Sequence, residues 1–200
     1  EISCSLVGSE MCIRDRPYLE SFGTKPLLIT GGHVYEAVGK DFEAYLTKQG
    51  FDVILVNFNG ESSTKEIDRI AAIAKDQGAT AIYGLGGGKT SDTAKAVADT
   101  AKLPVVIMPT LASTDAPCSR LSVIYKEDGT VENYRFYDHN PELVLVDSQV
   151  IANAPARLLV AGIADALATN VEAQAVTQSG ADTMLDAKQT LVGIAIAEKC

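Results

Sequence analysis

Strand-like and helix-like segments alternate along the first half of this chain, and the alternation is the strongest constraint on its fold. Segments with helical periodicity separate apolar runs typical of buried strands, which occupy residues 27–30, 52–58, 80–85 and 105–108. The connections between them are short. Because strand, helix and parallel strand form the repeating unit of a helix-covered sheet, the pattern predicts an α/β fold with a parallel, Rossmann-like sheet.

A hairpin interrupts this alternation after the fourth strand. Two strand-like runs, at 121–125 and 131–137, flank Asp128-Gly129, a dipeptide typical of two-residue hairpin turns. One more buried strand follows at 143–147. These signals predict a β-hairpin inserted into the path of the parallel sheet.

Three parts of the chain differ in pattern. Residues 17–152 form the expected Rossmann-like domain, and residues 153–200 are helical only, so we expect them to be the start of an all-α domain. The helical pattern has no cap at Cys200, which indicates that this second domain is incomplete. Residues 1–16 lack the core of a signal peptide and any clear periodicity, so they are either a translated non-native leader or a disordered native N-terminus.

Charge and composition argue against several kinds of partner. The formal net charge of -9 disfavours nucleic acid and anionic membranes, which select for clustered Lys and Arg. No apolar run approaches the ~18 residues that a membrane-spanning helix needs. The four cysteines have neither paired nor metal-type spacing, which favours a reducing cytoplasm.

A glycine-rich segment, residues 84–92, joins the third strand to the following helix. Its spacing does not match a P-loop, because Tyr83 stands where that motif needs a glycine. It does not match the common dinucleotide fingerprint either, because Lys89 stands where that motif needs its third glycine. A helix that follows glycines can still place its free N–H groups against a diphosphate. The residues expected at that diphosphate are Gly86, Gly87, Gly88 and Lys89. Asp92 would repel phosphate, so it either caps the helix or meets a sugar hydroxyl; the alternative for the glycines is close strand–helix packing.

A hydroxyl-rich loop follows the fourth strand, over residues 109–119. Its neutral donors are Thr110, Ser113, Thr114 and Ser119, and Asp115 is its only charge. Neutral donors with one carboxylate suit a polyhydroxyl compound better than an anion. An ordinary Ser/Thr-rich connection is the alternative.

Three motifs in this order closely resemble the glycerol dehydrogenases of the metal-dependent alcohol dehydrogenase family, which is related to dehydroquinate synthase. They are GGGKTSDTAK at 86–95, PTLASTDAPCS at 109–119 and PARLLVAGIADALAT at 155–169. The resemblance runs from about residue 26 to the end. It implies NAD-dependent oxidation of a small polyol, glycerol, to dihydroxyacetone at a zinc ion, by a protein that forms homo-oligomers when full length.

The resemblance also implies roles for individual residues. Gly88 and Lys89 would contact the NAD diphosphate, Asp115 would hold substrate hydroxyls, and Asp165 would be the first zinc ligand. The remaining cofactor contacts would come from Thr110, Ser113, Ser119, Leu121 and Tyr125. Two histidine zinc ligands would lie beyond residue 200, and no catalytic side chain is assigned. The chain alone should therefore bind NAD weakly and not oxidise glycerol.

Two departures from the family pattern leave alternatives open. Gly31-Gly32 replaces the acid that usually holds the adenosine ribose, so the preference for NAD or NADP stays open. His33 and His139 match no ligand motif and are expected at the surface. Read without the resemblance, Asp165 shares a helix face with Thr169 and Glu172, which is typical of a solvated stripe.

Other functions fit parts of the same pattern. A related dehydrogenase could act on another small polyol, a hydroxy acid or a glycerol phosphate, although a phosphorylated substrate would favour more cations near Asp115 than Arg120 alone. A non-catalytic nucleotide-binding module is the third possibility.

Overall fold

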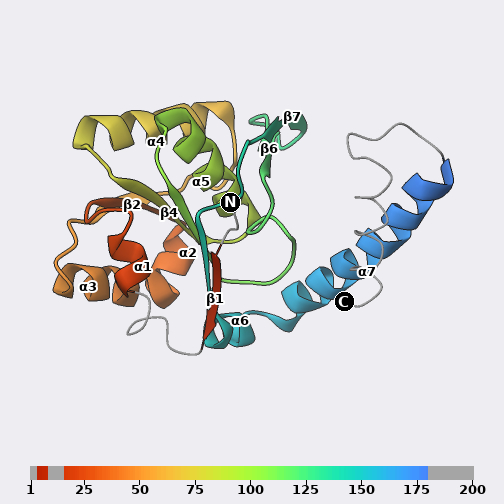
Figure 1. The fold of residues 1–200 in the computed structure, drawn as a ribbon, viewed down its shortest axis with the longest axis horizontal. Helices are drawn as coiled ribbons and strands as arrows, with labels where there is room; N and C mark the ends of the chain where they lie inside the picture. The colour runs from red at the N-terminus through yellow and green to blue at the C-terminus, as the bar shows by residue number, and fades with distance from the viewer. Residues whose placement is uncertain (1–3, 9–15, 180–200) are drawn as a thin grey trace.

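A six-stranded sheet forms the centre of the protein, which is described here by a computed structural model for residues 4–8 and 16–179 (Figure 1). The strand order is β1-β8-β5-β4-β2-β3, and each neighbouring pair is parallel. The strands are β1 (Cys4–Gly8), β2 (Pro26–Thr30), β3 (Ile54–Asn57), β4 (Ala81–Gly86), β5 (Val105–Pro109) and β8 (Leu143–Asp147). The predicted α/β fold with a parallel sheet is confirmed.

Helices cover both faces of the sheet (Figure 1). One face packs against α4 (Thr64–Gln77) and α5 (Gly88–Ala101), and the other packs against α1 (Arg16–Glu20) and α3 (Lys40–Lys48). Successive strand residues point to opposite faces, so β2, β4 and β5 each supply residues to both apolar cores. Every residue of β2, β4 and β5 is buried, which explains their continuous apolar runs.

The first predicted helix is built from three segments. A short α2 (Gly32–Val34) leads into a π-helical turn, η1 (Tyr35–Gly39), which continues as α3. Phe42 and Leu46 are buried, as the helical spacing predicted. The π turn was not predicted, because π turns occur as single wider turns inside helices whose apolar spacing stays helical.

Both ends of α4 agree with the sequence signals. Ser63 caps the first turn by accepting a hydrogen bond from the Glu66 N–H at 3.3 Å, and Gly78 ends the helix in the left-handed conformation. The reciprocal half of the capping box is absent from the hydrogen bonds of the described residues. The Glu66 carboxylate instead accepts hydrogen bonds from two amides of Asn59 and from the charged Arg69 guanidinium. The Ser63 N–H donates to the Glu61 carbonyl.

The hairpin consists of β6 (Leu121–Tyr125) and β7 (Val131–Phe136), which pair antiparallel beside α5. Its turn is longer than the predicted two-residue turn at Asp128-Gly129. The Lys126 N–H donates to the Thr130 carbonyl and the Gly129 N–H donates to the Lys126 carbonyl, so the loop spans five residues. A register shift between Ile124 and Tyr125 accompanies the extra length.

Residues 4–8 lie within the segment predicted to be a leader, and the structure describes them as a strand. They form β1, which pairs along its whole length with β8. On its other side, β8 pairs with β5 through two residue pairs, so without β1 it would be an edge strand with unpaired backbone groups. The five residues of β1 are too few to show strand periodicity in the sequence by themselves.

Helices α6 (Ser148–Asn153) and α7 (Ala156–Ser179) follow the sheet, as the change of pattern near residue 153 predicted. Helix α7 extends away from the sheet (Figure 1). Among the described residues, no helix is long and apolar enough to cross a membrane.

Candidate nucleotide-binding site

The glycine-rich segment turns from β4 into α5 at the carboxyl edge of the sheet. A Cβ atom on Gly84 would lie 2.6 Å from the Ala94 Cβ, and one on Gly86 would lie 2.5 Å from the Thr90 hydroxyl. These two glycines therefore let the strand and the helix pack closely. For Gly86, this is the packing role that the sequence left open as the alternative to diphosphate binding. Gly87 and Gly88 have more space around them.

The first turn of α5 offers its N–H groups to a ligand. Its N-cap is Gly87, which has no side chain to accept a hydrogen bond from them. The partial positive charge of a helix N-terminus then favours an anion at this position. The interpretation of Asp92 as a possible helix cap is wrong, because the carboxylate has other partners.

A cavity of about 370 Å³ opens beside this helix start, and we call it the first cavity. It is lined by Gly88, Lys89, Asp92, Thr114, Asp115, Ala116, Ser119, Leu121, Val123, Tyr125 and Asp165. Eight of the twelve residues predicted for the site are among these. The structure thus brings together the glycine segment, the hydroxyl-rich loop, the hairpin and α7.

The other four predicted residues lie next to this cavity rather than on its wall. Gly86 and Gly87 form the strand–helix junction, and Thr110 is buried beside it, donating its N–H to the Gly86 carbonyl at 3.0 Å. Ser113 is half-buried where the loop meets Gly162 of α7.

Lys89 is held at the mouth of the first cavity by two neighbours. Its Nζ atom lies 2.7 Å from a Glu61 carboxylate oxygen and 5.0 Å from the centre of the Tyr125 ring. A cation over an aromatic face is attracted to it. Sequence reasoning missed Glu61, because it follows β3 and no local pattern links it to a residue 28 positions away.

Asp92, which lines the first cavity, forms a buried ion pair with Lys95, which lies behind it. Their side chains are 9% and 2% exposed, and Lys95 Nζ lies 3.0 Å from Asp92 Oδ1. Burial raises the pKa of the Asp92 carboxyl, and burial lowers the pKa of the Lys95 ammonium, in each case against the attraction of the partner. The i, i+3 spacing of the two residues was the signal that could have revealed the pair.

Two exposed carboxylates from distant parts of the chain face the same cavity. Asp115 lies on the hydroxyl-rich loop, and Asp165 lies on α7. The helix approaches the loop closely, since a Cβ on Gly162 would overlap the Ala112 carbonyl oxygen. Among residues 4–8 and 16–179, no group of three or more His, Cys, Asp or Glu is arranged to hold a metal ion.

A second cavity, of about 570 Å³, lies at the carboxyl ends of β2 and β3. Its wall includes Thr30, Glu36 and the predicted surface residue His33, which is exposed. The Thr30 side chain is 2% exposed, and its hydroxyl has no hydrogen-bond partner within the part of the chain that the structure describes. The π turn η1 supplies Tyr35 and Glu36 to this wall, and such turns are frequent at functional sites.

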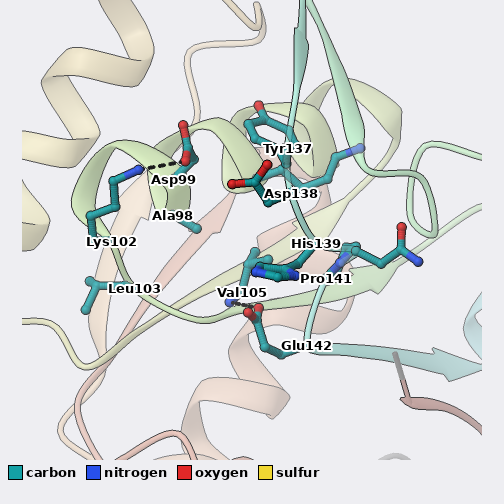
Figure 2. A pocket seen from close by; sticks show the side chains of 12 residues that line it. Ala98, Asp99, Lys102, Leu103, Val105, Tyr137, Asp138, His139, Pro141 and Glu142 are labelled. Atoms are coloured by element: carbon teal, nitrogen blue, oxygen red, sulfur yellow. Dashed lines mark hydrogen bonds and ion pairs between the residues drawn. The ribbon is translucent and has the colours of Figure 1, made fainter. Parts of the chain in front are cut away.

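A smaller cavity of about 230 Å³ lies at the amino end of β5, and Figure 2 shows its wall. His139, exposed as predicted, projects into it, and Glu142 beside it accepts a hydrogen bond from the Val105 N–H at 2.7 Å. None of the twelve predicted site residues lines it. The candidate site is therefore at the carboxyl edge of the sheet.

The position of the glycine-rich segment along the carboxyl edge of the sheet defines the class of the domain. In the sheet order, β4 stands between β2 and β5, so the start of α5 lies between the two cavities. A glycine-rich helix start between two cavities at the carboxyl edge of a parallel sheet is the arrangement of dinucleotide-binding α/β domains.

Comparison with known proteins gives the family. A family model described as iron-containing alcohol dehydrogenase matches residues 7–148. The chain therefore belongs to the iron-containing alcohol dehydrogenase family, which confirms the resemblance found in the three motifs.

Individual relatives narrow the comparison. The chain is 49% identical over 92% of its length to a glycolaldehyde reductase of Halobacterium salinarum, and it covers 50% of that protein. It is 45% identical over 96% of its length to a glycerol dehydrogenase of Escherichia coli, and it covers 53% of that protein. A crystal structure of a probable glycerol dehydrogenase from Sinorhizobium meliloti superposes with a TM-score of 0.83 at 38% identity, covering 99% of this chain and 54% of that one. The chain thus spans about half the length of these relatives.

Proposed function

We propose that this chain is the nucleotide-binding part of an NAD-dependent glycerol dehydrogenase, which oxidises glycerol to dihydroxyacetone. The observation that carries the proposal is the convergence of the glycine segment, Asp115 and Asp165 on the first cavity. Relatives named glycerol dehydrogenases, at 44–45% identity over most of the chain, support it.

NAD would lie across the carboxyl edge of the sheet. Its diphosphate would accept hydrogen bonds from the first N–H groups of α5 and from Lys89. The nicotinamide end would then enter the first cavity, beside Leu121 and Tyr125. The adenosine end would reach the second cavity. There the Thr30 hydroxyl, which has no hydrogen-bond partner among the described residues, and the Glu36 carboxylate would bind ribose hydroxyls, in place of the acid that the family carries at the position of Gly31-Gly32.

Asp115 would orient the substrate by accepting hydrogen bonds from glycerol hydroxyls. Its carboxylate is exposed at the cavity, and Thr114 and Ser119 supply neutral hydroxyls nearby. Orientation brings the carbon that loses the hydride toward the nicotinamide, which lowers the entropic part of the barrier.

Asp165 would supply one ligand to a zinc ion. When bound, zinc polarises the alcohol oxygen and lowers its pKa. A catalytic zinc takes three protein ligands, so one carboxylate from this chain holds it only together with donors from outside the described residues. The whole protein would act on small polyols in the cytoplasm as a homo-oligomer, without nucleic acid or membrane partners.

Binding and activity measurements test this function. Isothermal titration of the 200-residue chain should show NAD binding, and the chain alone should produce no NADH from glycerol. A chimera that joins this chain to the remaining half of the Escherichia coli relative should oxidise glycerol with NAD and zinc, and Asp115→Ala should abolish that turnover. If the chimera folds and binds NAD but does not oxidise glycerol, the proposal that glycerol is the substrate is wrong.

Glycolaldehyde is the second candidate substrate, because a relative at 49% identity is a glycolaldehyde reductase. It also presents a hydroxyl next to the reacting carbon, so Asp115 could orient it in the same way. The ratio of kcat/KM for glycolaldehyde reduction to that for dihydroxyacetone reduction by the chimera decides between the two substrates.

A further inference from the structure

The first cavity lies between two walls: the start of α5 forms the α5 wall, and residues 114–125, from the hydroxyl-rich loop and β6, form the hairpin wall. Lys95 connects these two walls from behind. Its ammonium group pairs with Asp92 on α5 and donates to main-chain carbonyls of the segment that forms the opposite wall. These acceptors are Ala116 at 2.7 Å, Ser119 at 3.2 Å and Leu121. The Ser119 hydroxyl lies at 3.3 Å from the same nitrogen.

Asp92 extends the connection to β6. Its second carboxylate oxygen accepts a hydrogen bond from the Val123 N–H at 3.2 Å, and its main-chain carbonyl accepts one from the Ser122 hydroxyl at 2.8 Å. The pair therefore holds α5, the end of the hydroxyl-rich loop and the first strand of the hairpin together.

The chemistry of the pair makes this connection rigid. A lysine ammonium has three N–H donors and no acceptor, and here it faces several oxygens in a space almost without solvent. A buried charge that loses a partner is strongly disfavoured, so the groups around it have little freedom to move. The segment from Ala116 to Val123 is thereby fixed relative to the helix that begins at the glycines.

We propose that Lys95 and Asp92 are a positioning pair that sets the distance between the α5 wall and the hairpin wall and so determines affinity for the nicotinamide end of the dinucleotide. The proposal rests on the proposed function, because it takes NAD as the occupant of the first cavity. Ser119, Leu121 and Tyr125 line the hairpin wall, whereas the diphosphate needs only the start of α5. NAD and ADP should therefore depend on the pair to different degrees.

The double variant Asp92→Asn/Lys95→Met removes both charges without leaving one buried alone. Its matched control is Asp99→Asn/Lys102→Met, an exposed i, i+3 pair on the same helix that lines neither cavity of the site. By isothermal titration, we expect the positioning double variant to bind NAD at least about tenfold more weakly, with ADP affinity changed by less than about threefold. The control should leave both affinities unchanged.

Each result decides the proposal. An equal loss of NAD and ADP binding means a general structural role and overturns it, as does unchanged NAD affinity. Wild-type protein that binds neither nucleotide contradicts the proposed function instead. Hydrogen exchange of ligand-free protein then still tests the pair: the Val123 amide should exchange at least about tenfold faster in the double variant than in wild type, and equal rates overturn the proposal. If the double variant does not fold, Asp92→Asn alone takes its place.

Discussion

Helices α5 and α7 both supply side chains to the first cavity, but their environments differ sharply. Every residue of α5 from Thr90 to Ala98 is buried. In α7, by contrast, five large apolar side chains are between 50% and 67% exposed: Leu159, Val160, Ile163, Leu167 and Val171. The nucleotide side of the site is therefore fixed within the α/β domain, whereas Asp165 stands on a helix whose apolar surface is largely uncovered by the described residues.

This difference predicts that substitutions on the α5 side change stability or nucleotide affinity, and that those on α7 affect only metal chemistry. The largest effect should come from the strand–helix junction. Gly84→Ala should destabilise the protein by about 1–3 kcal/mol, because the added methyl overlaps Ala94. Urea denaturation measures the change. The matched control is Gly31→Ala, since no atom lies within 4 Å of its added Cβ, and equal stability of the two variants would contradict the close packing.

Lys89 tests the diphosphate site itself. Lys89→Met should weaken NAD and ADP alike, by about tenfold or more, because a charge-assisted hydrogen bond to the shared diphosphate is lost. Isothermal titration of both ligands measures it, with Lys102→Met as the control. Equal losses distinguish Lys89 from the positioning pair, and a loss for NAD alone would place the diphosphate elsewhere.

A substitution of Glu66 tests how much its contacts stabilise the loop before α4, which carries Glu61 toward the glycine segment. Burial opposes ionisation of Glu66, but the Arg69 guanidinium and the Asn59 donors outweigh it and hold the pKa of the carboxyl below its ordinary value. Because the folded pKa lies below the unfolded value of about 4.3, the contacts stabilise the fold above that pH and lose this effect as pH falls through the folded value.

Glu66→Gln should therefore be less stable than wild type by about 1–2 kcal/mol at pH 7, with the difference shrinking below about pH 4. Urea denaturation of both proteins between pH 7 and pH 3 measures it. A difference that stays constant with pH would mean that the ionised carboxylate is not what stabilises this loop.

The smallest effect on nucleotide binding should come from α7. Asp165→Asn should change NAD affinity by less than about twofold, because the carboxylate contacts neither the glycine segment nor the hairpin in any described hydrogen bond. In the chimera, the same substitution should remove zinc-dependent turnover, whereas Glu172→Gln on the same helix should not. A large loss of NAD affinity in Asp165→Asn would contradict the division between the two helices.

Most elements of the fold were predictable because their signals are local. The apolar runs of β2, β4 and β5 and the Ser63 and Gly78 ends of α4 follow from burial and capping alone. Residues 4–8 were missed because pairing with an available sheet edge, not their own pattern, makes them a strand. The hairpin turn was misjudged because Thr130 extends the loop through hydrogen bonds that the dipeptide does not reveal.

The candidate site was predictable in its membership but not in its internal contacts. Motif spacing located eight of the lining residues, since loops at one edge of a parallel sheet must converge. The partners of Lys89 and Asp92 depend on tertiary packing, so Glu61 was missed and Asp92 was wrongly considered a helix cap. Lys95 lies within a recognised motif, but only the structure gives it a role.

Chemical-shift mapping of the nitrogen-15-labelled chain with NAD tests the central claim most directly. The claim is that the α/β domain binds the dinucleotide across the glycine segment without help from α7. We predict the largest shifts at the amides of Gly87, Gly88 and Lys89, further shifts near Thr30 and in β6, and none along α7 beyond Asp165. Shifts confined to residues 137–142, around the smaller cavity at the amino end of β5, or no shifts at saturating NAD, would contradict it.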